Sequence, residues 1–516
     1  MEHKGIQLDE LIGHVNQFTS VPTSTSHDDI LIRMADAFTK VDFLAKAFSQ
    51  AEDINAKINE YKAQLPGKNE EEQNNLKESI KNLQNELVRF RLSQKHLYIL
   101  AVEEIHTVAK ENNWDLCKHN EAVYLYNGCY WKIIEKGKFQ LFIGKALLKM
   151  GVPEFTAKDH KFWELVYNQF MATGYISEPP KSTSKVLVNF LNGTLEITSK
   201  GAHFRNFNPN DFLRYQLPYK FNPAAIMPKF QKFLDQVLPD TDTQKLLSEY
   251  LGYIFIPHQI LNLEKTLLLY GGGANGKSVL FNIVTALLGQ ENISNYSLQN
   301  LTNQNGYYRA QLGDVLCNYA SEISGDLQAA TFKQLVSGEP LDARLPYGNP
   351  FVLQNYAKLM FNTNQLPKSV EFTNAYFRRF IIIPFQVTIP PDQQDPELAT
   401  KIIETELSGI LNWVLDGLAN LLKNKKFTSS PLAEQMLKSY ESESDSVSSF
   451  IQENNFVADP VAQYLLKDLY SEYRLFCFED GYSPLNKRNF HARLKFLGYN
   501  TNRLSRGIVV SIAKSL

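Results

Sequence analysis

The residues best suited to chemistry lie in one glycine-rich stretch near the middle of the chain. Residues 271–278 read GGGANGKS and fit the pattern G-x-x-x-x-G-K-[ST]. Glycines at both ends of such a loop let the backbone turn so closely that its N–H groups face phosphate oxygens, and the N-terminus of a following helix adds partial positive charge. Lys277 would reach the β- and γ-phosphates of a nucleoside triphosphate, and Ser278 would bind Mg²⁺.

The flanking residues predict the strand and the helix that would position this loop. Residues 266–270 form an apolar run before it, and an amphipathic segment follows it and ends at Gly289. A chance match to the pattern should arise roughly once in fifty chains of this length. We therefore predict a P-loop whose nucleotide-binding residues are Gly271, Gly272, Gly273, Ala274, Asn275, Gly276, Lys277, Ser278 and Val279.

Two later apolar runs end in polar residues of the kind that phosphoryl transfer needs. Residues 315–322 end in Glu322, as expected of a strand that holds Mg²⁺ and polarises the attacking water, with Asp326 close behind. Residues 357–364 end in Asn364, which could hydrogen-bond that water or the γ-phosphate. A strand that ends in one acid is common by chance, so the prediction depends on the position of both runs after the glycine loop.

Two arginines precede a third apolar run. Arg378 and Arg379 stand immediately before residues 380–385. Arginines at the end of a strand are ordinarily solvated, but at this place in the chain they could reach a neighbouring subunit.

Composition restricts the class of protein. The chain has 516 residues, enough for about three to five domains, and 53 Lys plus Arg against 55 Asp plus Glu, so any contact with nucleic acid must come from local patches. The four cysteines form no C-x-x-C pair, which argues against a zinc site or a disulfide framework. No apolar run has the length of a membrane span, and the N-terminus lacks a signal-peptide core, so we expect a soluble, cytoplasmic protein.

The N-terminal part is expected to be helical up to about residue 112. Apolar residues recur at heptad spacing on both sides of Pro66 and Gly67, which predicts a helical hairpin. This hairpin either packs on its own domain or serves subunit assembly or the recruitment of a loader. Residues 113–224 then show short β-like runs joined by Asn-Gly turns, typical of an α+β domain. Its aromatic cluster could stack on bases or form hairpin core: Tyr124, Tyr126, Tyr130 and Trp131.

A proline-bearing linker, residues 218–228, leads into residues 225–392, which we expect to form the core. Two amphipathic segments, residues 230–237 and 243–255, should form a helical collar before the loop strand. Residues 393–440 read as further helices, followed by a Ser-, Glu- and Asp-rich linker at residues 439–449.

The last part, residues 441–516, has the order of elements of a winged helix. Residues 465–476 and 489–497 look helical, and residues 507–512 look like a strand. Residues 481–516 hold seven Lys or Arg and no Asp or Glu, a local footprint for phosphate, although a solvated basic face is the alternative. The candidate DNA-binding residues here are Lys487, Arg488, Arg493, Lys495, Arg503 and Arg506.

With these motifs in place, residues 186–385 resemble superfamily 3 helicases, in particular the phage and plasmid helicase-primase family related to the poxvirus nucleoside triphosphatase-primase. The resemblance, which with the C-terminal region covers roughly three quarters of the chain, is carried by residues 190–195, 217–219, Pro223, Phe230, 271–278, 320–322, 337–339, 343–344, 358–364, 366–367 and 377–380.

The resemblance implies an α/β fold with an AAA+-like P-loop ATPase core, usually assembled as a hexameric ring that translocates on single-stranded DNA and unwinds duplex. Lys277 and Ser278 would be the P-loop ligands, Glu322 the acid of the Mg²⁺ strand and Asn364 the sensor. Arg379 would be the arginine finger inserted into the adjacent protomer, with Arg378 as its substitute. Three residues would lie in the region that feeds the DNA-touching pore hairpin: Lys333, Arg344 and Tyr347.

Two departures from the family pattern matter. Many relatives carry paired acids at the end of the Mg²⁺ strand, but here Ser321 precedes Glu322, which leaves the general base open. Residues 1–112 show no pair of carboxylates on strands and no zinc cluster, so we expect no intrinsic primase activity.

The sequence therefore predicts a replicative DNA helicase of a phage, plasmid or other mobile element, with ATP and Mg²⁺ as cofactors. The expected partners are single-stranded and forked DNA, further copies of the chain, and a separate primase or replication initiator, with no membrane. The alternatives are an ATP-switched origin-binding or loader protein that does not unwind DNA, and a bifunctional helicase-primase.

Overall fold

The computed structural model describes residues 15, 26–119, 122–174, 184–198, 201–321, 323, 328–345, 349–367, 373–482 and 484–515. The chain folds into two compact units. Unit 1 comprises Met1–Thr19, Ser182–Arg205 and Gln216–Leu516, and unit 2 comprises Ser20–Lys181 and Asn206–Tyr215. Within the described ranges, no helix is both long enough and apolar enough to cross a membrane.

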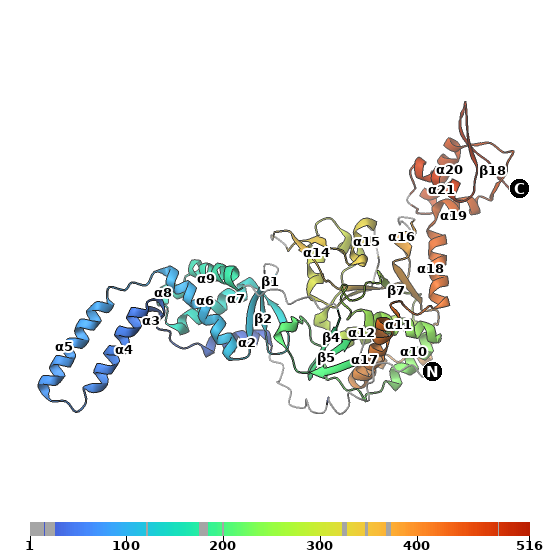
Figure 1. Cartoon of the computed structure of the whole chain (residues 1–516). Coiled ribbons are helices and arrows are strands. Elements are labelled where there is room, and N and C mark those ends of the chain that lie inside the picture. Colours follow the sequence, from blue (N-terminus) through green and yellow to red (C-terminus); the bar gives the residue numbers. More distant parts are fainter. Residues whose placement is uncertain are drawn as a thin grey trace. The chain divides into compact units, whose positions relative to one another are not determined.

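Unit 2 is a group of helices with one antiparallel three-stranded sheet of order β1-β2-β3 (Figure 1). Its elements are α2 (His27–Ala37), α3 (Phe43–Ala47), α4 (Ser49–Gln64), α5 (Glu70–Leu87), α6 (Gln94–Glu111), β1 (Asp115–His119), β2 (Ala122–Tyr126), β3 (Trp131–Ile134), α7 (Lys136–Met150), α8 (Glu154–Lys158) and α9 (His160–Thr173).

The expected domain boundary at residue 112 falls inside unit 2. One hydrophobic core takes Ile105 and Val108 from α6, Leu116 from β1 and Phe170 from α9. Because side chains from both sides of residue 112 bury one another, the helical region and the first part of the expected α+β domain fold together.

The predicted helical hairpin is formed by α4 and α5, which lie antiparallel in Figure 1. Gly67 has a φ of +90° in the turn, and Asn69 and Glu72 close a capping box at the start of α5. The hairpin has a small core of its own, built from Ile54, Ile58 and Ile80.

The aromatic cluster near the first strands is core. Tyr124, Tyr126 and Trp131 are buried together, and the indole N–H of Trp131 donates to the carbonyl oxygen of Pro209 at 2.9 Å. The hairpin-core interpretation is therefore confirmed for these three residues, since buried rings leave no face for a base.

Unit 1 begins with a three-stranded antiparallel sheet of order β4-β5-β6 and continues into a larger α/β assembly. Its elements up to β13 are β4 (Val186–Phe190), β5 (Gly193–Thr198), β6 (Gly201–Arg205), α10 (Pro228–Val237), α11 (Thr241–Tyr253), β7 (Thr266–Tyr270), α12 (Lys277–Leu288), β8 (Ile293–Ser294), α13 (Leu298–Thr302), α14 (Tyr307–Ala310), β9 (Cys317–Ala320), α15 (Ala329–Ser337), β10 (Leu341–Ala343), β11 (Phe351–Leu353), β12 (Lys358–Thr363), α16 (Asn374–Phe377) and β13 (Phe380–Pro384).

The centre of unit 1 is a parallel five-stranded sheet of order β13-β7-β12-β9-β8. Its strands β7 and β12 are buried over almost their whole length, because parallel strands covered by helices are buried on both faces. All five strands run the same way, so the residues that follow them gather at one edge of the sheet, the carboxyl edge. The residues that precede them gather at the opposite, amino edge.

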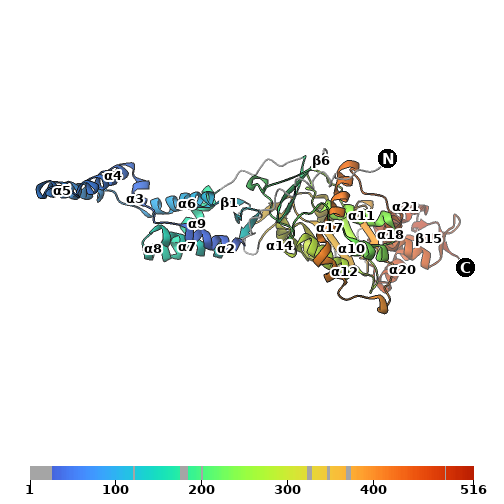
Figure 2. The ribbon, with the colours of Figure 1, turned by 90° about the horizontal axis from the view of Figure 1, so that it is seen from below.

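The collar helices are held by α17 (Leu398–Asn424), which packs against α10, α11 and α12; Figures 1 and 2 both show α10, α11 and α17 side by side. The buried carboxylate of Glu406 accepts hydrogen bonds from the backbone N–H groups of Lys229 and Phe230, at 3.0 and 2.9 Å. These are free N–H groups at the N-terminus of α10, where negative charge is stabilising. The side chain of α17 thus fixes the start of the collar.

The expected polar linker at residues 439–449 is helical instead. The helix α18 (Pro431–Ser444) is followed after one residue by α19 (Ser446–Glu453), and Asp445 between them caps α19 by accepting from Val447 N–H and Ser448 N–H. The buried Tyr440 packs on Phe377 and Phe380 of the core. A sequence rich in Ser and Glu is compatible with a helix when one face carries such anchors.

We call residues 446–515 the C-terminal module. They have their own hydrophobic core, a sheet of order β15-β17-β16, and the pair β14-β18. The elements after α19 are β14 (Phe456–Ala458), β15 (Tyr464–Leu465), α20 (Leu466–Glu479), α21 (Lys487–Phe496), β16 (Thr501–Leu504), β17 (Gly507–Val510) and β18 (Ile512–Lys514).

Candidate functional site

The glycine-rich loop leaves the carboxyl end of β7, as predicted, and runs directly into α12. Backbone hydrogen bonds to β12 and to the segment that follows β13 hold the loop. Gly271 N–H donates to the carbonyl oxygen of Thr363 at 3.2 Å, and Ile389 N–H donates to that of Ala274 at 2.7 Å. Since β7 lies between β12 and β13, the loop sits in the middle of the carboxyl edge, where ligands bind in open α/β sheets.

Two of the loop glycines are required by the fold. A Cβ on Gly271 would stand 2.4 Å from the carbonyl oxygen of Phe385, and one on Gly276, where φ is +87°, would stand 2.9 Å from the ring of Phe233. Gly272 and Gly273 differ, because a Cβ on either would meet no atom within 4 Å. Their outer surface is therefore bare backbone open to a ligand.

Lys277 ties the loop together from the first position of α12. Its Nζ donates to the carbonyl oxygens of Gly271 and Gly272, at 2.7 and 2.8 Å, and to Asn275 Oδ1 at 3.1 Å. Burial lowers the pKa of this ammonium group. All three partners are neutral, so an anion at the loop would be a stronger partner for the charge than any of them. Ser278 is exposed beside it.

A cavity of about 270 Å³ opens at the loop. Its lining residues are Tyr270, Gly271, Gly272, Gly273, Asn275, Pro384, Phe385, Gln386, Thr388 and Met436. The cavity thus combines open loop backbone with residues that follow β13, at the edge where the loop N–H groups lie.

Asn364 follows β12 and is exposed at the same edge as the loop, one residue after the Thr363 carbonyl that Gly271 contacts. The preceding amide, Asn362, is buried and accepts from the hydroxyl of Tyr319 on β9 at 2.9 Å, which joins the two strands. The structure therefore brings Asn364 to the glycine loop. Glu322 and Asp326 lie outside the described residues; β9 ends at Ala320, at this edge.

The arginine pair lies at the opposite, amino edge of the sheet. The carbonyl oxygen of Arg379 accepts from Thr266 N–H, the first residue of β7, at 2.8 Å. β7 and β13 run in parallel register from Thr266 and Phe380 to Tyr270 and Pro384. Arg379 therefore lies six residue steps before the level of Gly271, and at about 3.3 Å per residue this separates it from the glycine loop of the same chain by roughly 20 Å.

The two arginines have different environments. The side chain of Arg379 is only 8% exposed, and it donates to Ser337 Oγ at 2.8 Å and to the carbonyl oxygen of Ala375. The side chain of Arg378 is 58% exposed and forms an ion pair with Glu264 at 3.0 Å. In this chain Arg378 is therefore the more accessible of the two, because Arg379 is bonded to buried groups whereas Arg378 is held only by an ion pair at the surface. The expected roles of Arg379 as the finger and Arg378 as its substitute remain a prediction.

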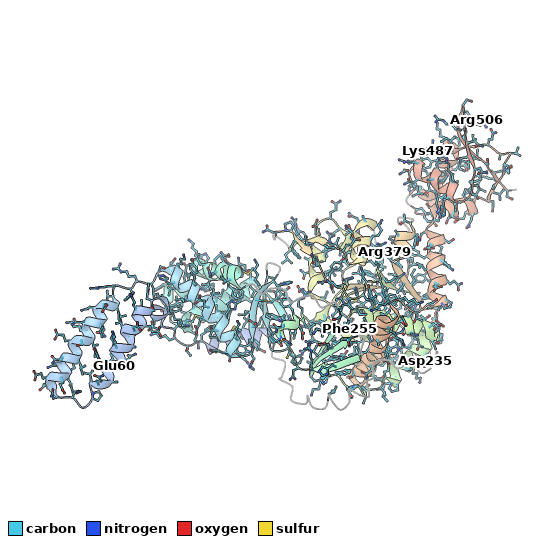
Figure 3. All side chains as sticks on the ribbon, viewed as in Figure 1. Glu60, Asp235, Phe255, Arg379, Lys487 and Arg506 are labelled. Carbon is cyan, nitrogen blue, oxygen red and sulfur yellow. The ribbon has the colours of Figure 1, made fainter. Side chains whose placement is uncertain are left out.

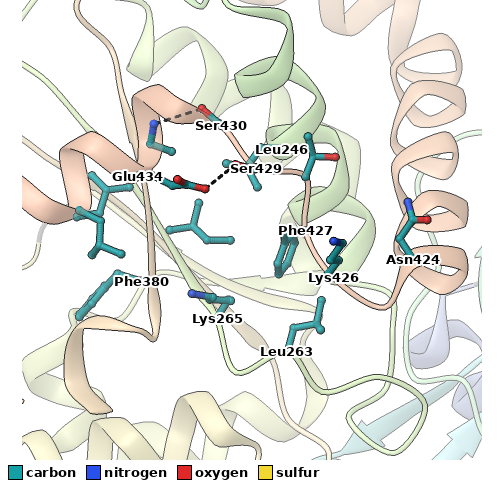
Figure 4. Close-up of a pocket in the computed structure, with 15 residues that line it drawn as sticks. Leu246, Leu263, Lys265, Phe380, Asn424, Lys426, Phe427, Ser429, Ser430 and Glu434 are labelled. Atoms are coloured by element: carbon teal, nitrogen blue, oxygen red, sulfur yellow. Dashed lines mark hydrogen bonds between the residues drawn. The ribbon is translucent and has the colours of Figure 1, made fainter. Parts of the chain in front are cut away.

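A larger cavity of about 460 Å³ lies beside the arginine pair at the amino edge (Figure 4). Apolar side chains such as Leu246, Phe380 and Phe427 form much of its wall. Two of its polar groups bond within the chain: Ser429 Oγ donates to Glu434 Oε1 at 2.5 Å, and Lys265 Nζ donates to the carbonyl oxygen of Arg378. This arrangement supports the backbone at Arg378 and places no acid and base together for catalysis.

The predicted pore residues are distributed over separate elements. Lys333 is half-buried on α15. Arg344, which follows β10, is exposed, and its guanidinium lies 5.0 Å over the ring of Tyr307 and donates to the Tyr307 hydroxyl at 2.7 Å. Tyr347 lies outside the described residues.

The predicted DNA-binding cations of the C-terminal module are exposed, with one exception. Lys487, Arg488 and Lys495 lie on α21, and Arg503 and Arg506 on the strands and turn of the β16–β17 hairpin; Figure 3 labels Lys487 and Arg506. The exception is Arg493, whose Nε and Nη2 donate to Asp445 Oδ2 at 3.0 and 2.6 Å. These bonds tie α21 to the start of α19, and the expected role of Arg493 as a phosphate contact remains a prediction.

Glu264 was not predicted from the sequence. Its carboxylate lies 3.0 Å from Arg378 and 3.5 Å from Arg379, and it stands two residues before β7 in the left-handed region, with a φ of +52°. More than a hundred residues separate it from the arginines in the chain. Only the pairing of β7 with β13 brings them together.

Parts of the chain match two protein families. Residues 102–239 match a family described as D5 N terminal like, and residues 269–379 match DUF5906, a family of unknown function. The chain therefore contains a D5 N terminal like region before the glycine loop. The second match begins in β7 and ends at Arg379, so it covers the loop, Asn364 and the arginine pair.

Among solved structures, the chain is similar to the C-terminal region of NrS-1. One apo structure of that region has a TM-score of 0.44 and 15% sequence identity, over 80% of this chain and 98% of that chain. Its A form has a TM-score of 0.42 and 14% identity, with the same coverage. Similarity this distant does not assign a function.

Proposed function

We propose that this chain hydrolyses ATP at sites shared between neighbouring copies and uses the energy to move along DNA as a replicative helicase of the superfamily 3 type. One observation carries the proposal. A single chain presents a glycine loop with Lys277 and Asn364 at one edge of its sheet and an exposed arginine at the other. Two copies related by a head-to-tail contact would bring those two edges together, whereas one copy alone cannot.

At the loop, the open backbone of Gly272 and Gly273 and the N-terminus of α12 would bind the phosphates. Lys277 would exchange its carbonyl partners for phosphate oxygens, which is favourable because charge-assisted hydrogen bonds are stronger than neutral ones. Ser278, which is exposed beside Lys277, would bind a Mg²⁺ ion, and that ion would neutralise charge developing on the transferred phosphoryl group. Asn364 would orient the attacking water.

Arg378 of the next copy would complete the site. Its surface ion pair with Glu264 is worth at most about 1 kcal/mol, so a phosphate that carries several negative charges would displace the carboxylate readily. Arg379 would keep the backbone of the finger in place from inside the core. The D5 N terminal like region and the resemblance to phage and plasmid helicase-primases support placement in DNA replication.

The test is nucleotide hydrolysis and strand separation by the full chain and by Lys277→Ala. We expect the wild-type chain to hydrolyse ATP faster with single-stranded DNA present and to unwind a forked duplex. Lys277→Ala should lose at least about 10²-fold in turnover, since phosphoryl transfer depends almost entirely on positioning and charge. Lys426→Ala, which removes an exposed lysine that lines the larger cavity, serves as the control.

Two results would contradict the proposal. Normal turnover in a well-folded Lys277→Ala variant would remove the nucleotide site. Hydrolysis without any translocation or unwinding by the assembled protein would favour the ATP-switched loader instead.

A further inference from the structure

The C-terminal module exposes a phenylalanine in an unusual setting. Phe496, the last residue of α21, is 77% exposed. The apolar residues of the same helix that the core needs, Phe490 and Leu494, are fully buried, so Phe496 is not required for the fold of the module. A single exposed apolar side chain needs no explanation by itself. The residues that surround Phe496, however, indicate a function for its exposure.

The guanidinium of Arg493 lies over the ring of Phe496 at 4.5 Å from its centroid. Arg493 cannot move freely, because its two hydrogen bonds to Asp445 hold it, and Asp445 is itself buried as the cap of α19. One face of the Phe496 ring is therefore held by a fixed planar cation. The rest of the ring faces solvent, and the contact with Arg493 fixes its orientation.

The charged residues that flank this ring in the sequence are all basic, and the carboxylate of Asp445, which lies next to Arg493 in space, is bonded to Arg493. Residues 481–516 contain seven Lys or Arg and no Asp or Glu. Arg488 and Lys495 are exposed and seven residues apart on α21, which places them on one stripe of the helix, and Lys495 directly precedes Phe496. A polyanion that follows this stripe would pass beside the ring.

We propose that Phe496, oriented by Arg493, stacks on an unpaired base of single-stranded DNA while Arg488 and Lys495 contact the adjoining phosphates. A base inside a duplex has both faces covered by its neighbours, so a flat aromatic side chain selects bases that are unpaired. An aromatic ring with cations beside it is the usual arrangement in proteins that bind single strands without sequence preference. The inference rests on the proposed function only in taking DNA as the partner.

The chain offers a matched control. Phe478 on α20 is 85% exposed and belongs to the same module, but the residues that follow it are acidic, Glu479 and Asp480. Phe478→Ala removes the same apolar surface as Phe496→Ala without removing a ring next to cations.

The experiment measures binding of the full chain to a fluorescent thymidine oligonucleotide, without nucleotide, and to a duplex of the same length. We expect Phe496→Ala to weaken single-strand binding by roughly 5- to 150-fold, the range for loss of one stacked base. Phe478→Ala should leave it unchanged, and Phe496→Trp should retain it. The slope of log K against log salt concentration should stay unchanged in Phe496→Ala. In Lys495→Ala its magnitude should fall by about one, the value for one lost phosphate contact.

Equal losses in Phe496→Ala and Phe478→Ala, or equal losses on single strand and duplex, would overturn the proposal. A change in sedimentation in Phe496→Ala, with DNA binding intact, would identify the ring as part of a protein contact and would also overturn it. Because no ATP is present, the measurement is independent of the nucleotide site: a chain without ATPase activity could still bind single strands through Phe496, and an active ATPase could lack this contact.

Discussion

Arg378 and Arg379 are adjacent in sequence and differ in what their removal should do. Arg378→Ala should lower ATP turnover by about 10³-fold or more, the range for loss of an arginine finger, with no change in Tm. Arg379→Ala breaks buried hydrogen bonds to Ser337 and Ala375 and should lower the free energy of unfolding by about 1 to 3 kcal/mol. Turnover and thermal melting of both variants give the comparison.

Mixing experiments separate the two arginines further. If Arg378 acts on a neighbouring copy, Arg378→Ala chains mixed with Lys277→Ala chains should regain part of the activity, because some interfaces then pair an intact loop with an intact arginine. Recovery by Arg379→Ala chains but not by Arg378→Ala chains would restore the role predicted from the sequence.

His258 gives the protein a pH dependence on the acid side. Burial, and then the charge of Lys358, whose Nζ lies 2.9 Å from His258 Nδ1, lower the pKa of His258 to about 3. The unfolded chain takes up this proton near pH 6.5, while the folded chain stays neutral. Stability should therefore be complete above pH 6.5 and fall by about 1.4 kcal/mol per pH unit between pH 6 and pH 4 through this group.

Denaturant unfolding of wild type and His258→Gln at several pH values measures that slope. The free energy of unfolding of the variant should change less steeply with pH, by the roughly 1.4 kcal/mol per pH unit that one proton contributes. His160→Gln, at a histidine that is 83% exposed, is the control and should keep the wild-type slope. Parallel pH profiles for wild type and His258→Gln would show that another group is responsible.

For single residues, the sequence predicts those whose position depends only on the strand or helix next to them in the chain. Lys277, the two structural glycines and Asn364 follow from their places beside apolar runs, and the structure has them at one edge of the sheet. The environments of Arg378 and Arg379 could not be predicted, because their partners Glu264 and Ser337 reach them through strand pairing and helix packing. The bonds between Arg493 and Asp445 could not be predicted for the same reason, since Asp445 is distant in the chain.

Among elements, the loop between β7 and α12 offers the sharpest test. Gly276→Ala places a Cβ against Phe233 at a φ of +87° and should cost roughly 2 to 4 kcal/mol of stability. Gly273→Ala meets no atom of the chain and should leave stability within about 0.5 kcal/mol. It should nevertheless weaken ATP binding by at least about tenfold, a change of only ~1.4 kcal/mol, because the methyl group occupies the phosphate side of the loop.

Thermal melting and nucleotide titration of these two variants supply the measurement. Undiminished ATP binding by Gly273→Ala would mean that the phosphates do not approach this part of the loop. A fully stable Gly276→Ala would mean that the turn into α12 can relax.

Strands and helices with strong periodicity were predictable, and their mutual order was not. The residues of β7, β12 and β13 read as buried strands, and α10, α11 and α12 as amphipathic helices. The strand order β13-β7-β12-β9-β8 depends on which strands pair after each connecting segment. This pairing joins residues far apart in the chain, so it cannot be predicted from any single segment. The end of α18 and the start of α19 were read as a linker, because the polar composition there gave no sign that Tyr440 packs on the core and that Asp445 caps a helix.

For the whole molecule, the hairpin α4–α5 can be removed as a unit. Its core residues are separate from the main core of unit 2, and Phe48 and Phe90 at its base lie 5.3 Å apart between ring centroids. Replacing residues 52–86 by a short Gly-Ser linker should therefore leave the Tm of the remaining chain nearly unchanged. Circular dichroism and sedimentation check both stability and assembly.

A loss of oligomers with the fold intact would favour the assembly role of the hairpin over simple packing on its own domain. A large loss of stability would contradict the separate core described for it.

The placement of the loop and the arginine pair at opposite edges of one sheet also has a statistical consequence under the proposed function. Each chain would take part in two sites, as the donor of the loop in one and of the arginine in the other. In mixtures with wild type, chains that lack either Lys277 or Arg378 would reduce activity in proportion to their share. Chains that lack both would disable two sites each, so the surviving activity would follow the square of the wild-type fraction.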